Sequence, residues 1–141
     1  MNLEEAIKHI NVCAEQMNSR YGSVVFDEWV IVSLRQHHAR ILSYSGPRND
    51  QFLQNFAKDF GSLRASLVDQ KYLPGDFEFA RHGVGTGFES FMVLGSELYL
   101  ICNHTTRTMT EISAEPKWLN AQIPFAELGN KFQGDPLAMP M

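Results

Sequence analysis

Two apolar runs separated by only three residues place the strongest constraint on how this chain can fold. The runs Phe88 to Leu94 and Leu98 to His104 are rich in aliphatic and aromatic residues, which is typical of strands. Gly95-Ser96-Glu97 connects them. A connection this short can join only antiparallel neighbours, because a parallel pair needs a crossover of about a dozen residues or more. The sequence therefore predicts an antiparallel sheet.

A hairpin is predicted nearer the start of the chain. The run from Val24 to Leu34 consists largely of β-branched and aromatic residues, and we expect a break in it at Asp27. A second run, Ala39 to Ser45, follows after a short polar stretch. That stretch lacks the Asn-Gly or Asp-Gly pair of the tightest turns, so we predict a connection of four or five residues.

A further strand is predicted after a turn. Leu73-Pro74-Gly75-Asp76 is a typical turn sequence, and after it Phe77 and Phe79 alternate with Glu78 as in a short, half-buried strand. Together with the hairpin and the C-terminal strand pair, this segment gives a sheet of about five strands.

Two helices are predicted between and before these strands. Asn2 and Glu5 form a capping box, and apolar residues then recur three and four positions apart up to Gly22. The second helix covers Asp50 to Leu67, where we expect Gly61 to mark a close contact with another backbone. The apolar faces consist of Leu3, Ile7, Ile10, Ala14, Met17 and Tyr21 in the first helix, and of Phe52, Leu53, Phe56, Phe60, Leu63 and Leu67 in the second.

The C-terminal part is predicted to be helical as well. Thr108 and Glu111 form another capping box, and Pro116 suits the start of a helix. Pro124 lacks a backbone donor, so it should bend or split that helix. The segment from Gly134 to Met141 contains two prolines and is expected to be irregular.

These elements predict an α+β fold with a single five-stranded antiparallel sheet and helices, in the order α-β-β-α-β-β-β-α. A chain of 141 residues has the length of one domain, and its sequence contains no internal repeat, linker or low-complexity segment. We assign residues 1–133 to a single α+β domain and residues 134–141 to a C-terminal tail.

Composition argues against several classes of function. The formal net charge of -4, without a cluster of Lys and Arg, disfavours nucleic acid as a partner. The N-terminus does not resemble a signal peptide, and no apolar stretch is long enough to span a membrane, so we expect a cytoplasmic protein. The cysteines, Cys13 and Cys102, are expected to be small buried hydrophobes.

No complete catalytic, cofactor or metal-binding set can be assigned. Gly83-Val84-Gly85-Thr86-Gly87 lies between two predicted strands, so we interpret it as an inter-strand loop rather than a phosphate-binding loop. Cys102 and His104 would share one face of a strand, but a zinc site needs three or four ligands. Adjacent His37 and His38 would point to opposite sides of an extended chain, so they cannot easily ligate one metal together.

The order of elements resembles the roadblock family of dynein-light-chain-like proteins and, more distantly, the longin and profilin-like folds. The resemblance rests on the segments Leu3 to Tyr21, Val24 to Ser45, Asp50 to Leu67 and Phe77 to His104. It implies a non-enzymatic signalling adaptor without a cofactor, a homodimer that regulates a Ras-like small GTPase. In the family the second helix and third strand form the dimer interface, which here implies Phe52, Phe56, Phe77 and Phe79.

Two other hypotheses belong to different classes. The aromatic-rich strands are compatible with a sensor or carrier that binds a small apolar ligand between sheet and helices, as in several profilin-like folds. A metal-dependent enzyme would instead use Cys102, His104 and one of His37 or His38.

Overall fold

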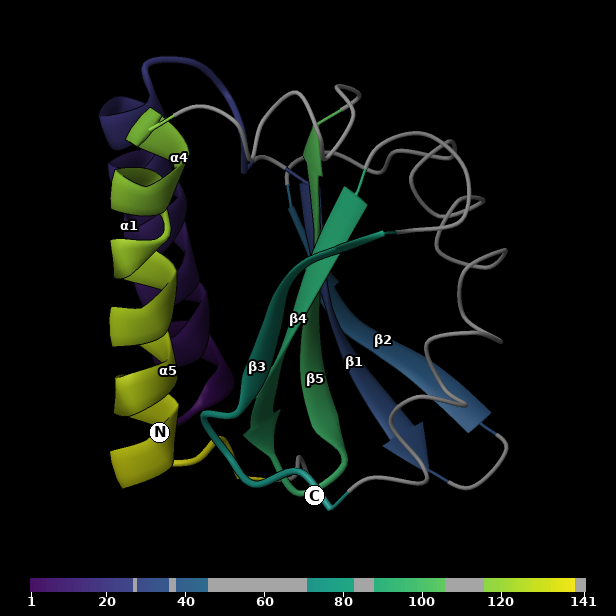
Figure 1. The fold of residues 1–141 in the computed structure, drawn as a ribbon. Helices are drawn as coiled ribbons and strands as arrows, with labels where there is room; N and C mark the ends of the chain where they lie inside the picture. Colours follow the sequence, from purple (N-terminus) through teal and green to yellow (C-terminus); the bar gives the residue numbers. More distant parts are fainter. Residues whose placement is uncertain (27, 36–37, 46–70, 83–87, 106–115, 139–141) are drawn as a thin grey trace.

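The computed structural model describes residues 1–26, 28–35, 38–45, 71–82, 88–105 and 116–138, without the side chains at 38, 80–82, 88–89 and 103–105. Within these residues it shows an α+β fold with one five-stranded open sheet in the order β2-β1-β5-β4-β3, all neighbours antiparallel (Figure 1). The strands are β1 (Glu28–Arg35), β2 (His38–Tyr44), β3 (Phe77–His82), β4 (Phe88–Gly95) and β5 (Leu98–Thr105). The predicted fold class is confirmed.

Helices α1 (Leu3–Tyr21), α4 (Pro116–Ala121) and α5 (Ile123–Gly134) lie along one face of this sheet (Figure 1). Contacts at both ends show that α1 runs antiparallel to the other two. The Arg20 guanidinium donates to the Asn120 carbonyl at one end, at 3.4 Å, and the Met1 ammonium contacts the Asp135 carboxylate beyond the other, at 2.7 Å. In the part of the chain that the structure describes, no helix combines the length and apolar character needed to cross a bilayer.

Helix α1 forms as its sequence predicts. The Glu5 N–H donates to the Asn2 side chain at 2.8 Å, and the capping box is complete. Gly22 ends the helix in the left-handed region at φ 89°, a conformation that glycine adopts without strain. The buried face of α1 is centred slightly to one side of the predicted apolar face, since Leu3, Ile7 and Ala14 are only half-buried. The buried face consists of Ala6, Ile10, Cys13, Met17 and Tyr21.

The first strand begins later than predicted. Val25 and Phe26 are buried, but their N–H groups both donate to the Asn18 side-chain oxygen, at 2.8 and 2.9 Å, instead of to a neighbouring strand. The Asn18 amide in turn donates to the Phe26 carbonyl at 3.1 Å. Because one helical asparagine satisfies these backbone groups, the apolar run joins the core as an irregular segment, and β1 starts only at Glu28. The break predicted at position 27 lies outside the described residues.

The hairpin connection is shorter than predicted. Pairing continues to Arg35 opposite His38, which leaves only positions 36 and 37 between the strands instead of four or five residues. Polar side chains do not interrupt a ladder that is made by the backbone, so the strands extend through the polar stretch. The register shifts once, from Ile31 opposite Ser43 to Val32 opposite Ile41, so that Leu42 is the additional residue of a β-bulge.

The predicted effect of Pro124 is confirmed. Pro116 is the first described residue of α4, and the helical segment is split between Ala121 and Ile123. Pro124 then lies in the first turn of α5, where its missing N–H costs no helical hydrogen bond. The helix predicted over 50–67 and the capping box at Thr108 and Glu111 lie outside the described residues.

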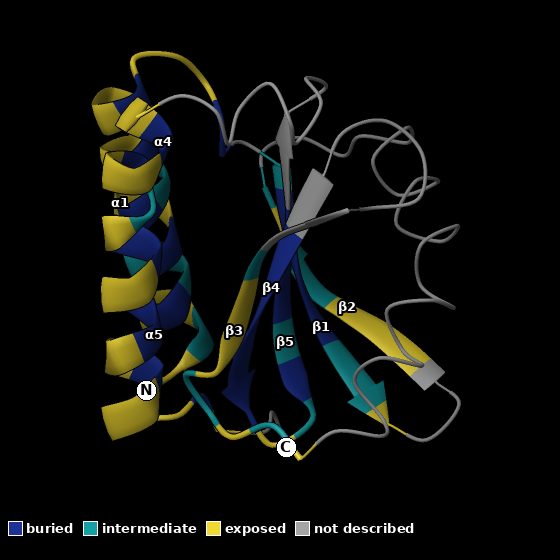
Figure 2. Cartoon of the chain, viewed as in Figure 1, coloured by how far each residue is buried: buried dark blue, intermediate teal, exposed yellow. Residues whose placement is uncertain are grey.

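Buried side chains form clusters on both faces of the sheet, and Figure 2 shows them on the central strands and the inner sides of the helices. The larger cluster joins the sheet to the helices: Ala6, Ile10, Cys13, Met17, Phe26, Trp29, Ile31, Met92, Leu94, Leu98, Leu100, Cys102, Phe125, Leu128, Phe132 and Leu137. Strand alternation places the other cluster on the opposite face: Val30, Val32, Phe91, Val93 and Ile101.

Close backbone approaches occur at glycines other than the one expected from the sequence. A Cβ added to Gly75 would lie 2.5 Å from the Gly129 carbonyl oxygen, and one added to Gly129 would lie 2.8 Å from the Gly75 oxygen. A Cβ on Gly95 would clash with the Leu137 carbonyl. These glycines let α5 and the chain after it pack directly on the sheet. Gly61, the glycine expected to make such a contact, lies outside the described residues.

Candidate functional site

Strand β3 forms one edge of the sheet and carries exposed apolar side chains. Among the described strands it has β4 as its one neighbour. Phe77 on this strand is 41% exposed, and Leu73, just before it, is 68% exposed. We call Leu73, Phe77 and Phe79 with their strand backbone the β3 edge.

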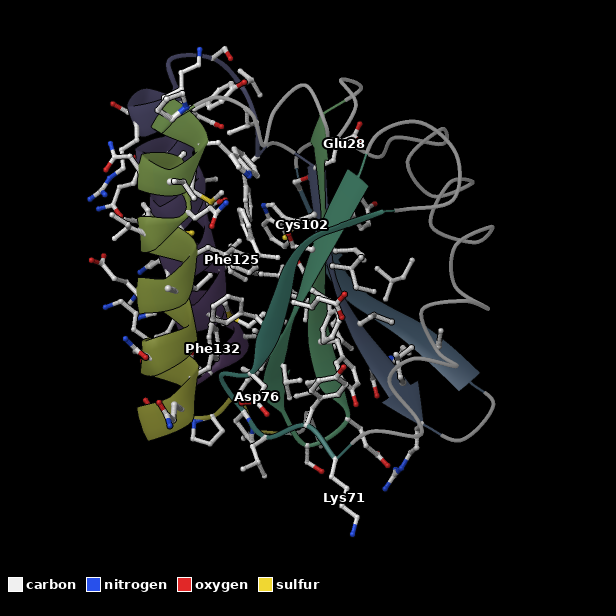
Figure 3. All side chains as sticks on the ribbon, in the orientation of Figure 1. Glu28, Lys71, Asp76, Cys102, Phe125 and Phe132 are labelled. Carbon is white, nitrogen blue, oxygen red and sulfur yellow. The ribbon has the colours of Figure 1, made fainter. Side chains whose placement is uncertain are left out.

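A row of contacting aromatic rings holds this edge against the helices. Phe79 stacks on Trp118 of α4 at 5.1 Å between ring centroids and packs on Phe125 of α5 at 4.9 Å. Phe77 meets Phe125 edge to face at 5.4 Å. Tyr21 of α1 meets Trp118 edge to face at 5.8 Å. Phe125, labelled in Figure 3, therefore supports both β3 aromatics from within the core.

The start of β3 is fixed by the turn that precedes it. The Asp76 carboxylate accepts the Leu73 N–H at 2.8 Å, which closes the turn (Figure 3). The Gly75 N–H donates to the Val93 carbonyl, and the Val93 N–H donates to the Asp76 carbonyl, both at 2.8 Å. The backbone before Phe77 is thus bonded to β4, so the exposed ring projects from a well-anchored position.

The four residues implied as a dimer interface divide into two groups. Phe77 and Phe79 lie together on the β3 edge, with Phe79 turned mainly toward Trp118 and Phe125. Phe52 and Phe56 lie outside the described residues. Of this implied interface, the structure therefore describes only the part on strand β3.

Of the residues considered for a metal site, the structure describes only the side chain of Cys102. Cys102 is buried in the core, between Trp29 and Ser90 on the neighbouring strands. His38 and His104 lie on β2 and β5 but their side chains are not described, and His37 and the loop at 83–87 lie outside the described residues. Among the described side chains, no group of three or more His, Cys, Asp or Glu could hold a metal ion.

Both cysteines are buried thiols, as predicted. Cys13 lies beneath a hollow of about 220 Å³ between α1 and α5, beside Glu127 and Leu128. Burial, and then the Glu127 carboxylate, raise the pKa of the Cys13 thiol from an ordinary value of 9.0 to about 12. Cys13 is therefore protonated at neutral pH and is a poor nucleophile.

This pKa shift predicts a loss of stability at alkaline pH. The pKa of Cys13 is higher in the folded state than in the unfolded state. The contribution of this thiol to the free energy of unfolding is therefore fully present below about pH 9 and decreases as the pH rises toward 12. At pH 10.5 we expect the free energy of unfolding to have fallen by about 2 kcal/mol on this account. Denaturant titrations at pH 8 and pH 10.5 measure the loss, and Cys13→Ala should show a loss smaller by that amount. Equal losses in the two proteins would show that folding does not hinder ionisation of Cys13.

A larger hollow lies where α1 begins. It has a volume of about 520 Å³ and opens between the helix start, the bulge of β2 and the segment after α5. We call it the basal pocket, and its lining residues are Met1, Asn2, Leu3, Glu5, Leu42, Leu137 and Ala138.

Sequence patterns do not identify the residues that matter most at the β3 edge and in the basal pocket. Phe125 and Trp118 are recognisable as apolar helix residues, but not as the support of one particular strand. Leu42 faces the basal pocket because of a bulge, and Leu137 because its N–H bonds to the Leu94 carbonyl at 2.7 Å. Neither the bulge nor this bond has a local sequence signature.

In comparisons with protein-family models, curated proteins and solved structures, the chain matched none.

Proposed function

We propose that this protein is a non-enzymatic interaction module that forms a homodimer through the β3 edge, acts in the cytoplasm and, like the roadblock-type adaptors it resembles, engages a Ras-like small GTPase. The observation that carries the proposal is the half-exposed ring of Phe77 on an edge strand, held in place by Phe125. The resemblance supplies the GTPase, and the thiol state of both cysteines is compatible with a reducing compartment.

An edge strand is suited to self-association because it presents backbone donors and acceptors to a further strand. When two copies meet about a two-fold axis, the same strand of each copy pairs with the other in antiparallel orientation. Such pairing would extend the antiparallel sheet across both molecules without changing the fold of either.

The aromatic side chains add an anchor to this backbone pairing. Phe77 is already oriented by its contact with Phe125, so little side-chain entropy is lost when a partner covers the ring. Leu73, in the turn before the strand, is a further exposed apolar residue. Buried aromatic anchors of this kind provide much of the binding energy in protein interfaces.

The opposite edge of the sheet provides an internal comparison. Strand β2 also exposes apolar side chains, and Ile41, at 38%, is exposed to nearly the same extent as Phe77. A substitution at Ile41 thus matches one at Phe77 in exposure and in its place on an edge strand, but it tests the other edge.

We expect Phe77→Glu to weaken the dimer about thirtyfold or more, because it places a charge in the apolar centre of the paired edge. Ile41→Glu should leave the dimer unchanged. Sedimentation velocity of both variants and of the unmodified protein, over a range of micromolar concentrations, measures the dissociation constant. Circular dichroism checks that each variant is folded, and Leu73→Glu serves as a second edge variant if Phe77→Glu unfolds.

A strictly monomeric unmodified protein, or a dimer lost in Ile41→Glu and kept in Phe77→Glu, would refute the proposed interface. The GTPase part of the proposal is tested separately with the same proteins. A GTP-loaded Ras-like GTPase from the same cell should be retained by the immobilised unmodified protein. Complete absence of retention would refute the GTPase part of the proposal without affecting the proposed dimer.

A further inference from the structure

We propose that the basal pocket binds a small molecule with an apolar body and an ammonium head, and that Glu5 receives the head. This site shares no residue with the β3 edge. It goes beyond the proposed interaction module, and it gives a location to the ligand-binding role that the sequence allowed as an alternative.

The size and lining of the pocket suit a small ligand. Its volume of about 520 Å³ lies within the range of about 300–1,000 Å³ that is common for ligand sites. The apolar part of the wall comes from Met1, Leu3, Leu42, Leu137 and Ala138. An aliphatic chain or a ring placed there would bury apolar surface, which is favourable in rough proportion to the area covered.

The wall is built from segments that are held in place independently of any ligand. Leu137 is buried, and its carbonyl packs against Gly95 while its N–H bonds to the Leu94 carbonyl at 2.7 Å. The Met1 side chain is only 4% exposed, and its carbonyl accepts the Ala138 N–H at 3.4 Å. A preformed wall of this kind avoids much of the ordering cost of binding.

The charge of the pocket selects the head group. Glu5 is the one charged side chain among the described residues that line it. The nearby Met1 ammonium is already paired with the Asp135 carboxylate at 2.7 Å, so it offers little to an anionic ligand. The Glu5 carboxylate makes only a long contact, 3.4 Å, with the Asn2 N–H, which leaves it able to accept from an ammonium group.

The start of α1 presents a competing attraction for anions, since a helix N-terminus carries about half a positive charge. Here the capping box already engages one N–H group at this end of the helix, because the Asn2 side chain accepts the Glu5 N–H at 2.8 Å. The full negative charge of Glu5 also outweighs the helix dipole at this place. We therefore assign the pocket to cations rather than carboxylates.

Three probes with the same apolar chain test this assignment at neutral pH: octylamine, octanol and octanoate. NMR titrations of the full-length, isotopically labelled protein would follow the amides of Leu3, Leu42 and Leu137. We expect octylamine to shift these amides and to bind about threefold to fivefold more tightly than octanol, with octanoate weakest.

Variants of the protein test the recognition of the ligand's head group and of its apolar body separately. Glu5→Gln keeps a residue that can complete the capping box, so it should abolish the preference for octylamine without changing octanol binding. Glu4→Gln is the matched control, because Glu4 is exposed on the same helical turn and does not line the pocket. Ala138→Trp, at an exposed lining position, should fill the pocket and remove binding of all three probes.

The proposal is supported if octylamine is preferred and only Glu5→Gln, of the two glutamate variants, removes the preference. It is overturned if octanoate binds as well as octylamine, if no probe shifts the lining amides, or if Ala138→Trp binds the probes unchanged. None of these results bears on the dimer, which sedimentation measures in the absence of the probes.

Discussion

Replacing Phe125 by alanine should lower the free energy of unfolding by about 3–5 kcal/mol, which is a large part of the about 5–15 kcal/mol that holds a typical domain folded. Phe125 is fully buried, and its ring contacts those of Phe26, Phe77 and Phe79. Truncation would remove this apolar surface and leave a cavity that the surrounding rings can fill only partly. Urea denaturation followed by circular dichroism measures the change.

Leu119→Ala is the control for this substitution. Leu119 lies on the neighbouring helix α4 but is 69% exposed, so we expect its loss to cost less than about 0.5 kcal/mol. A Phe125→Ala variant as stable as Leu119→Ala would mean that the row of rings is not a packed core. Because Phe125 orients Phe77, the variant should also weaken the dimer while it remains folded.

Gly75→Ala should destabilise the protein by about 2–5 kcal/mol, the sum of two separate effects. Gly75 has φ 92°, a conformation that costs other residues about 1–2 kcal/mol. Its added Cβ would also lie 2.5 Å from the Gly129 oxygen and 2.9 Å from Gln133 Cβ, so α5 would have to move away from the turn. Displacement of packed backbone adds about 1–3 kcal/mol. Thermal and urea unfolding measure the total.

Gly22→Ala isolates the conformational part, so that the steric part at Gly75 follows by difference. Gly22 has nearly the same φ, 89°, but a Cβ there meets nothing within 4 Å. It should therefore show the conformational cost alone, about 1–2 kcal/mol. If both alanine variants lose the same stability, the close approach between the turn and α5 has no energetic consequence.

Elements defined by neighbours in the chain were predictable from the sequence. The capping box at Asn2 and Glu5 and the stop at Gly22 bound α1 through hydrogen bonds that span only a few residues. Pro124 splits the C-terminal helix for an equally local reason, its missing N–H. The short link between β4 and β5 likewise determined that these two strands pair in antiparallel orientation.

Predictions failed where a hydrogen-bond partner outside the predicted strand or turn decides the structure. The run from Val24 onward has strand composition, yet the Asn18 side chain takes up the N–H groups of Val25 and Phe26 before a strand can begin. The hairpin turn is tighter than its residue types suggest, because the ladder continues to Arg35 and His38. Composition reports what suits a strand, whereas a ladder also requires a partner at the right place.

The candidate sites also combine features that the sequence predicts with features that only tertiary contacts decide. Phe77 and Phe79 were identifiable as alternating strand residues beside a turn, because alternation is a property of the chain itself. The sequence alone thus determined that this protein has an antiparallel sheet with helices, and where most of their ends lie. Tertiary structure alone decided that β3 is an edge, that Phe125 supports it, and that Leu42 and Leu137 meet around a pocket. Those features depend on strand order and on contacts between distant segments, which local periodicity does not encode.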